Sequence, residues 1–360
     1  MKGESMRRKK LVRALKKKGM LPYLVTDLVN VRYLTGFGGT YAYLVIAPGR
    51  SYLISDSRYE EYARSLTTPA VEFVLQKNGL ADSLKSICGK IGAKELFVEE
   101  HSTVLSLYQG LKRDVRGVRF TPGGDEINSI RMVKDDDEIE ILRQAARITD
   151  SCVEHLKGVI RPGVTEWDIA IEIENFYRRN GCRKCSFDSI VASGPGASMP
   201  HYATSMEKRV REGEAVMIDM GCEYRGYNSD LTRTMFVHSI DPALERIYRI
   251  VREAQEAAVR AVRPGITTGG LDAIARDIIS GAGYGDKFGH SLGHGIGMEV
   301  HEIPAVKKGD LKLKKNMVIT IEPGIYLPGT GGVRIEDMVA VTAAGREVLT
   351  ASSKDIIVIG

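Results

Sequence analysis

The sequence predicts a protein of two domains: an α/β domain over residues 1–124, followed by an α+β domain over residues 125–360 that contains an internal repeat. Three observations predict this organisation. Short β-rich runs alternate with helical patterns in the first part of the chain, long amphipathic helical patterns begin at Lys134, and the motif RPG(V/I)T occurs twice in the second part. With 360 residues, of which 43% are apolar, the chain can bury a large hydrophobic core.

Residues 20–120 carry the α/β pattern. YAYLVIAPGRSYLIS has the composition of β-strands, and SRYEEYARSL has the pattern of a helix. TPGGDEINS at residues 121–129 is rich in turn-forming residues, so we interpret it as the linker that leaves this domain.

Basic residues are concentrated near the start of the chain. Residues 7–18 hold eight Lys or Arg, and without them the net charge of +5 would be −3. This cluster fits a nucleic-acid-binding segment, or the solvated side of a helix whose apolar side carries Leu11 and Leu15. We favour the solvated helix and therefore expect no nucleic-acid partner.

Several features indicate a cytoplasmic protein. No run of about twenty apolar residues is present, so we expect no membrane span. Arg13 and Lys16 interrupt the apolar residues that a signal peptide would need. The five cysteines are odd in number and scattered, which is typical of reduced thiols, and Cys182 and Cys185 form a CxxC without the second pair that a zinc knuckle requires.

The second domain is built on a repeat. RPGVT at residues 161–165 recurs as RPGIT at residues 263–267, and each copy stands between two helical patterns. Thr165 in the first copy, and Thr267 or Thr268 in the second, are predicted to cap the helices that follow.

Each half of the repeat also offers two carboxylates. Asp219 ends the apolar run AVMIDMG and Glu322 ends MVITIEPG, while Asp230 and Glu336 follow in YNSDLTRT and VRIED. Two like charges about 4 Å apart repel by roughly 4 kcal/mol at an effective dielectric of about 20. Several such pairs exceed a typical folding stability of about 5–15 kcal/mol. If the halves bring the four acids together, they must share protons or surround cations, although each acid alone also fits a salt-bridged strand end.

Three histidines occur close together in FGHSLGHGIGMEVHEIP at residues 288–304. The interleaved glycines disfavour a helix, so we expect His290, His294 and His301 on extended or looped backbone. Four carboxylates and one imidazole would form an oxygen-rich site suited to Mn²⁺, Co²⁺ or Zn²⁺. Two such ions would polarise a carbonyl and lower the pKa of a bridging water, which is the chemistry of hydrolysis.

These residues stand in five motifs whose order is specific: VMIDMG, NSDLTRT, GHSLGHGIGMEVHE, TIEPGIY and GVRIED. The set resembles the M24 metallopeptidase family of pita-bread enzymes, which includes methionine aminopeptidase, aminopeptidase P and prolidase. The likeness extends from about residue 130 to about residue 350. The preceding domain resembles the creatinase-type N-terminal domain, through NVRYLTGFGG at residues 30–39. The resemblance implies a pita-bread fold with a pseudo-twofold repeat, and a homodimer.

The resemblance also implies a ligand set for two divalent ions, with Mn²⁺ as the first choice and Co²⁺ or Zn²⁺ as alternatives. Asp219 would hold one ion, Asp230 and Glu336 would bridge both, and His294 with Glu322 would complete the second coordination sphere. Glu322 would in addition carry a proton from the bridging water to the leaving amine.

Further residues are assigned to the substrate by the same resemblance. His201 and His301 would contact the substrate carbonyl and the tetrahedral intermediate. His290 would line the pocket for the residue after the cleaved bond. Phe187 and Ile190 would form the apolar proline pocket, although packing in the core accounts for them almost equally well.

Arg334 stands two residues before a predicted bridging ligand. A fixed guanidinium at that place can orient a metal-bound carboxylate. The alternative is a surface arginine, and we favour the orienting role.

The substrate is expected to be a peptide that contains proline, because RIED and the long N-terminal domain resemble the proline-directed branch of the family. Similar prolidases carry arginine in a form like H-E-x-P-R, whereas this sequence has Ala305 at that place. We therefore favour aminopeptidase P over a dipeptidase of the prolidase type, although Lys307 or Lys308 would also offer a cation. A non-catalytic pita-bread binding protein is a third hypothesis, against which the complete ligand set argues.

Overall fold

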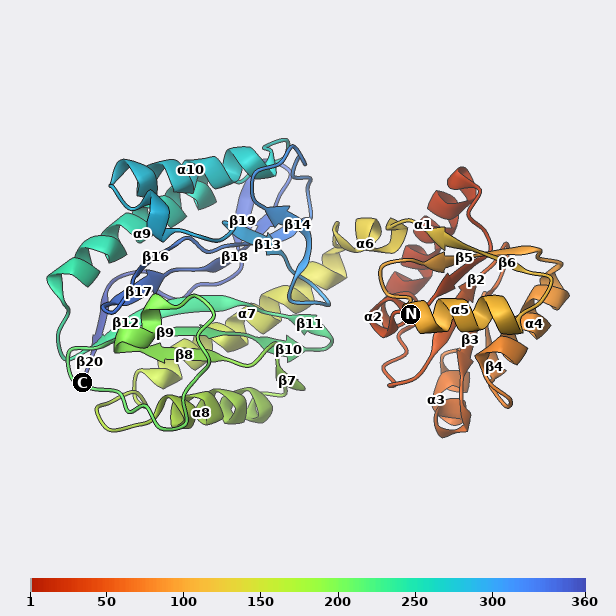
Figure 1. The fold of residues 1–360 in the computed structure, drawn as a ribbon, viewed down its shortest axis with the longest axis horizontal. Helices are drawn as coiled ribbons and strands as arrows, with labels where there is room; N and C mark the ends of the chain where they lie inside the picture. Colours follow the sequence, from red (N-terminus) through yellow and green to blue (C-terminus); the bar gives the residue numbers. More distant parts are fainter. Residues whose placement is uncertain (1) are drawn as a thin grey trace. The chain divides into compact units, whose positions relative to one another are not determined.

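The computed structural model describes residues 2–360, which form two compact units (Figure 1). Unit 1 extends to Arg131, and unit 2 comprises Met132–Gly360. The boundary lies seven residues after the predicted one, which was at residue 124. Among the described residues, no helix has both the length and the apolar character needed to cross a bilayer.

Unit 1 is an α/β unit, as predicted. Its six strands form one mixed sheet in the order β4-β3-β2-β1-β5-β6, in which β1 pairs antiparallel with β2 and parallel with β5. The elements in chain order are α1 (Lys2–Lys18), β1 (Tyr23–Val25), α2 (Leu28–Thr35), β2 (Tyr43–Ile46), β3 (Ser51–Ser55), η1 (Ser57–Tyr59), α3 (Glu60–Ser65), β4 (Val71–Leu75), α4 (Leu80–Ile91), β5 (Glu95–Glu99), α5 (Leu105–Asp114), β6 (Arg119–Gly123) and α6 (Glu126–Arg131).

The linker predicted at residues 121–129 is wrong. This segment contains the end of strand β6 and most of helix α6. Helix α6 belongs to unit 1 because Glu126 forms an ion pair with Lys18 of α1, and Arg131 donates to Asn30 Oδ1 at 2.9 Å. These contacts join residues about a hundred positions apart, so the turn-forming composition of the segment gave no sign of them.

Unit 2 contains four long helices and several small sheets. Its elements in chain order are α7 (Asp136–Leu156), α8 (Glu166–Arg179), β7 (Lys184–Cys185), β8 (Ile190–Ser193), η2 (Gly194–Ser198), β9 (Ala215–Met220), β10 (Cys222–Tyr224), β11 (Tyr227–Asn228), β12 (Leu231–Val237), α9 (Pro242–Ala261), α10 (Thr268–Gly281), η3 (Gly285–Lys287), β13 (Gly293–Gly295), β14 (Glu302–Val306), β15 (Val318–Ile321), β16 (Gly324–Leu327), β17 (Gly331–Arg334), β18 (Asp337–Val341), β19 (Arg346–Val348) and β20 (Ile357–Ile359).

Helix α7 begins where the acidic sequence predicts a helix start. Asp135 caps it by accepting a hydrogen bond from the backbone N of Glu138 at 2.9 Å, and the Glu138 carboxylate accepts from the backbone N of Asp135 at 2.9 Å. This reciprocal capping box satisfies two of the helix's unpaired N–H groups.

The two halves of unit 2 have the same plan. In the first half, α7 and α8 pack with the sheet β20-β12-β9-β8, and in the second, α9 and α10 pack with the sheet β14-β13-β15-β18-β19. Figure 1 shows α8 on one side of the strands and α9 with α10 on the other. Val153, Ile173 and Ile218 lie in the core of the first half, while Val251 and Ile319 lie in that of the second, and all five are at most 1% exposed.

The repeated motif has the same role in both halves. Thr165 caps α8 by accepting from the backbone N of Asp168 at 3.0 Å, and Thr267 caps α10 by accepting from that of Gly270 at 3.0 Å. Each threonine also forms an isolated bridge with a later residue, Arg209 in the first half and Lys312 in the second. The prediction of a repeat with capping threonines is thus confirmed, with Thr267 as the second cap.

We expect the Thr165→Ala variant to lower the free energy of unfolding of unit 2 by about 1 kcal/mol, because the first turn of α8 loses its cap. Urea denaturation followed by circular dichroism measures this difference. The exposed Thr330 offers a matched control, since T330A removes the same atoms at the surface and should change stability by less than about 0.5 kcal/mol. Equal losses in the two variants would contradict the capping role.

Candidate metal centre

The four predicted acids come together in unit 2 from four strand ends. Asp219 lies in β9 and Asp230 directly precedes β12, which is the neighbour of β9. Glu322 directly follows β15 and Glu336 directly precedes β18, and these two strands are also paired. Because each half contributes one strand pair, the acids of the two halves meet where the halves adjoin.

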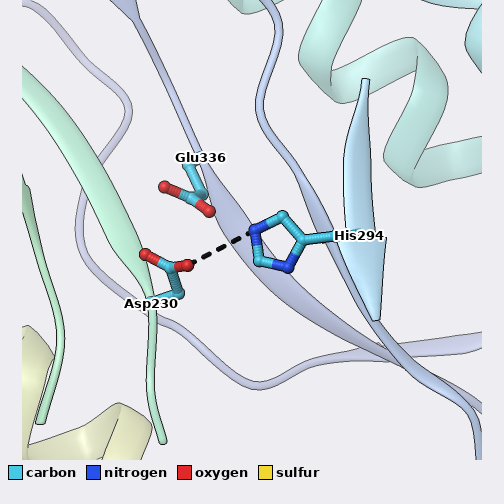
Figure 2. Close-up of side chains that lie close together, drawn as sticks. All are labelled: Asp230, His294 and Glu336. Atoms are coloured by element: carbon cyan, nitrogen blue, oxygen red, sulfur yellow. Dashed lines mark ion pairs between the residues drawn. The ribbon is translucent and has the colours of Figure 1, made fainter. Parts of the chain in front are cut away.

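His294 lies among these acids on strand β13. Its Nε2 atom is 3.3 Å from Glu322 Oε1 and 3.5 Å from Asp230 Oδ2. Ligand atoms of Asp230, His294 and Glu336 all lie within 4.8 Å of one another. Figure 2 shows the three side chains directed toward a common space.

The imidazole of His294 is held in the form that binds metal. Its Nδ1 atom is 3.1 Å from the carbonyl O of Gly295, which makes Nδ1 the donor and leaves the Nε2 lone pair facing the acids. Burial lowers the pKa of His294 to about 4, so the ring is neutral near pH 7. A lone pair that faces carboxylate oxygens is electrostatically unfavourable unless a proton or a cation lies between them.

Burial also acts on the acids. It is the largest cause that raises the pKa values of Asp230 and Glu336 well above the usual carboxyl range, and repulsion from neighbouring carboxylates adds to it. Burial, with Asp219 nearby, raises the pKa of Glu322 to about 7. Neighbouring carboxyls with raised pKa values require either protons or a bound cation.

The residues present fit a divalent ion. Among the described residues, Asp219 Oδ1 and Glu336 Oε1 are buried and have no hydrogen-bond partner. A buried carboxylate oxygen is rarely left without one. Oxygen atoms without partners, together with the neutral His294, form the oxygen-rich donor set that Mn²⁺, Co²⁺ and Zn²⁺ accept. The assignment of individual ligands to individual ions remains a prediction.

Two threonines that the sequence analysis missed orient the acids. Thr232 Oγ1 donates to Glu336 Oε2 at 2.7 Å. Thr320 Oγ1 donates to Glu322 Oε1 at 3.0 Å and accepts from the backbone N of His294 at 3.0 Å. One signal was present in the sequence for Thr320, because it lies two residues before Glu322 and therefore on the same face of an extended chain.

Arg334 is buried beside the acids and is not a surface arginine. It is 3% exposed, and its Nη2 donates to Asp219 Oδ2 at 2.7 Å. Its Nε donates to Thr232 Oγ1 at 3.0 Å, and its Nη1 donates to the carbonyl O of Pro200 at 3.2 Å. The guanidinium thereby fixes one oxygen of Asp219 and leaves the other free for a ligand.

His290 lies beside this arginine but has a different partner. Its Nε2 is 2.9 Å from the hydroxyl of Tyr326, which also accepts from Arg334 Nη1 at 3.0 Å. Burial, followed by the charge of Arg334, lowers the pKa of His290 to about 4. Tyr326 was not predicted as a site residue, although it is the last residue of the motif TIEPGIY.

The loop that carries His290 is held by helix α10. Arg276 donates to the carbonyl O of Phe288 at 3.0 Å and to that of His290 at 2.9 Å. Asp272 Oδ1 accepts from Arg276 at 2.9 Å and from the backbone N of Leu292 at 3.2 Å. This pair gives the glycine-rich loop a fixed path from α10 to β13.

The remaining predicted substrate residues occupy different positions. His301 is exposed, and its ring centroid is 4.3 Å from that of His294. His201 is exposed and directly follows Pro200, the residue that Arg334 holds. Ile190 is half-buried and pairs directly with Asp219 across strands β8 and β9, while Phe187 is half-buried three residues earlier. Their contacts with substrate remain predictions.

Comparisons with known proteins cover both units. The profile of metallopeptidase family M24 matches residues 140–343, and that of the creatinase/prolidase N-terminal domain matches residues 7–133.

The Xaa-Pro dipeptidase of Pyrococcus horikoshii is 37% identical over 351 residues, which cover 97% of this chain and 98% of that protein. A solved Xaa-Pro dipeptidase from Bacillus anthracis matches with a TM-score of 0.95 and 39% identity, covering 99% of this chain and 100% of that one. The X-Pro aminopeptidase from Thermotoga maritima matches with a TM-score of 0.89 and 37% identity, covering 96% of this chain and 100% of that one.

We expect Mn²⁺ at a hundredfold excess over its dissociation constant to stabilise the metal-free protein by about 2.7 kcal/mol, because the ion binds only the folded acids. The Glu336→Gln variant should lose most of this stabilisation, since it removes one charged ligand. Thermal unfolding with and without Mn²⁺ measures the difference.

The exposed Glu253 in α9 provides the matched control, because E253Q makes the same chemical change away from the centre. It should respond to Mn²⁺ as the unaltered protein does. If Mn²⁺ stabilised E336Q as strongly as E253Q, Glu336 would not be a ligand.

Proposed function

The chain belongs to metallopeptidase family M24 and is a hydrolase of the Xaa-Pro peptidase class, and from this premise we propose that it acts as an aminopeptidase P-type enzyme. Such an enzyme removes the residue that precedes proline from peptides longer than two residues. The predicted pita-bread fold and creatinase-type N-terminal domain are confirmed. The relatives include both dipeptidases and an aminopeptidase, so the length of the substrate has to be argued from this chain's own residues.

Ala305 carries the proposal of a longer substrate. It is exposed on β14 and pairs directly with His294 of β13. Side chains of directly opposed residues in antiparallel strands share one face, with Cβ atoms about 4.5–5.5 Å apart. A cation at this position would stand beside the centre and could hold the free carboxylate of a dipeptide, whereas alanine brings no charge there. Dipeptidase activity remains the alternative, with the exposed Lys307 or Lys308 as the cation.

The five ligand candidates would hold two divalent ions, with Mn²⁺ as our first choice. When bound, the ions supply Lewis acidity to the scissile carbonyl and lower the pKa of water. The residues expected to hold them are Asp219, Asp230, His294, Glu322 and Glu336.

Glu322 is suited to carry the proton. In hydrolysis the water oxygen bonds to the carbonyl carbon, the bond from that carbon to the proline nitrogen breaks, and the nitrogen takes up a proton. Thr320 fixes Oε1 of Glu322, and the backbone N of Glu322 donates to the carbonyl O of Leu292 at 2.8 Å, so the side chain starts from an anchored position. We assign to it the transfer of the water proton to the leaving nitrogen.

The exposed histidines are assigned to the carbonyl oxygen. A donor aimed at the charge that develops on this oxygen stabilises the tetrahedral intermediate more than the substrate. His301, whose ring lies against that of His294, and His201, beside the residue that Arg334 holds, are the candidates. His290, Phe187 and Ile190 are left to line the pocket for proline.

We expect the tetrapeptide Xaa-Pro-Yaa-Zaa to be cleaved with a higher kcat/KM than the dipeptide Xaa-Pro in the presence of Mn²⁺. The reason is that the dipeptide must bring its free carboxylate close to the acids without a cation at position 305. Product analysis of both peptides measures the preference, and Xaa-Ala-Yaa-Zaa controls for the requirement for proline. Preference for the dipeptide would favour the prolidase alternative, and cleavage of neither peptide would overturn the proposal.

We expect Ala305→Arg to shift the preference toward dipeptides by about 10- to 100-fold in the ratio of kcat/KM values, because hydrogen bonds to charged groups contribute about 1.5–3 kcal/mol. Ala305→Met is the matched control, since it adds bulk without charge. Steady-state kinetics on both peptides gives the ratio. Equal shifts in the two variants would show that size at position 305, and not charge, controls the preference.

A further inference from the structure

A buried arginine lies behind the acids and contacts none of their carboxylate oxygens. Arg233 on β12 is 1% exposed. Its five N–H donors are all used: one reaches Asp337 Oδ1 at 2.7 Å, and four reach the carbonyl oxygens of Thr232, Glu336, Ser352 and Ser353. A guanidinium with every donor engaged has a fixed orientation.

The partner of this arginine is equally enclosed. Asp337 is 0% exposed and directly follows Glu336. Its Oδ1 also accepts from Thr350 Oγ1 at 2.9 Å, and its Oδ2 accepts from Gln255 Nε2 at 2.8 Å and from Lys354 Nζ at 2.6 Å. Residues 350–354 therefore close the network, and Lys354 is its most exposed charged member, with 22% of its side chain accessible.

The network joins the two halves of unit 2 where the predicted bridging ligands lie. Asp230 and Arg233 belong to the first sheet through β12, whereas Glu336 and Asp337 lead into the second sheet through β18. No ladder of backbone hydrogen bonds pairs β12 with β18 among the described residues. Arg233 spans this gap, because it binds the backbone O of Glu336 and the carboxylate of the next residue.

Two further contacts, both made by Thr232, hold the predicted ligand Glu336 directly. The backbone N of Glu336 donates to the carbonyl O of Thr232 at 3.2 Å, and Thr232 Oγ1 donates to the Glu336 carboxylate at 2.7 Å. Thr232 directly precedes Arg233, so one short stretch of β12 binds both the backbone and the side chain of Glu336. Thr232 and Arg233 together thus hold Glu336 beside β12, the strand that Asp230 directly precedes.

We propose that Arg233, Asp337 and Lys354 are positioning residues that fix the spacing of Asp230 and Glu336 and thereby allow a second divalent ion to bind. This inference rests on the proposed dinuclear function. A buried ion pair is a weak source of stability compared with apolar packing, which agrees with a role in geometry. Removing groups that orient metal ligands typically weakens metal affinity by about 10- to 100-fold.

Lys354 supplies the sharpest test because it reaches the surface and its replacement should leave the fold intact. Lys354→Met removes the charge, whereas Lys354→Arg keeps it. Asp337→Asn removes the charge at the centre of the network with little change in shape. Glu253→Gln is the control, because the exposed Glu253 in α9 takes part in none of the hydrogen bonds of this network.

The measurements are Mn²⁺ titration of the metal-free proteins by calorimetry and electron paramagnetic resonance of the loaded proteins. We expect K354M and D337N to bind the second ion about tenfold or more weakly, with loss of the signal of coupled Mn²⁺ pairs. K354R and E253Q should stay within about twofold of the unaltered protein. Circular dichroism shows whether each variant is folded. Should D337N not fold, the comparison of K354M with K354R decides the question.

Two results would count against different claims. Folded K354M and D337N that bind two ions as tightly as the unaltered protein would overturn the positioning role and leave the proposed function standing. An unaltered protein that binds fewer than two ions would overturn the dinuclear function on which this inference rests.

Discussion

Mutual repulsion among buried carboxylates is the constraint around which unit 2 is organised. Burial and neighbouring charges raise the pKa values of Asp230, Glu322 and Glu336, so the folded chain holds these acids only together with protons or cations. The surrounding contacts fix single oxygens and leave other, buried oxygens free for a ligand: Arg334 binds one oxygen of Asp219, and Thr232 binds one of Glu336. The polar side chains around the centre therefore fix the orientation of the carboxylates, while a bound cation would supply the positive charge that balances them.

The repeated plan of unit 2 explains how distant acids converge. Each half pairs a strand that has an acid at or just after its end with a strand that an acid precedes, and a capped helix stands at the same place in both. Neither half alone supplies all the metal-binding atoms of the centre, which the four acids and His294 form together. The site is consequently a property of the interface between the halves, and the hydrogen bonds that cross it from Arg233 and Thr232 are part of its construction.

Patterns that span a few residues predicted the helix cap, the repeat and the acids at strand ends. They did not predict the side-chain contacts around the centre. The capping of α8 by Thr165, the repeat and the acids at strand ends follow from composition and spacing, which act over a few residues. The roles of Tyr326 and Arg233 do not, because their partners come from other elements and leave no periodic trace. The repeat gathered the four acids and one imidazole into a candidate site, although each acid alone kept an ordinary alternative. The choice of His294 and the role of each ligand came only through resemblance. The mistaken linker at residues 121–129 has the same cause, because long-range contacts decided where α6 belongs.

The span of the contacts between Thr232 and Glu336 has a kinetic consequence. Both this pair and the pair of Arg233 with Asp337 join residues 104 positions apart. Closing so long a loop costs chain entropy before any contact offsets it, so such pairings form slowly compared with a helix or a hairpin. Strands β8, β9 and β12 can pair early, but the metal centre is complete only when the two halves dock. Binding of divalent ions to the complete ligand set would therefore follow docking, because before it the acids of the two halves lie apart and do not repel one another.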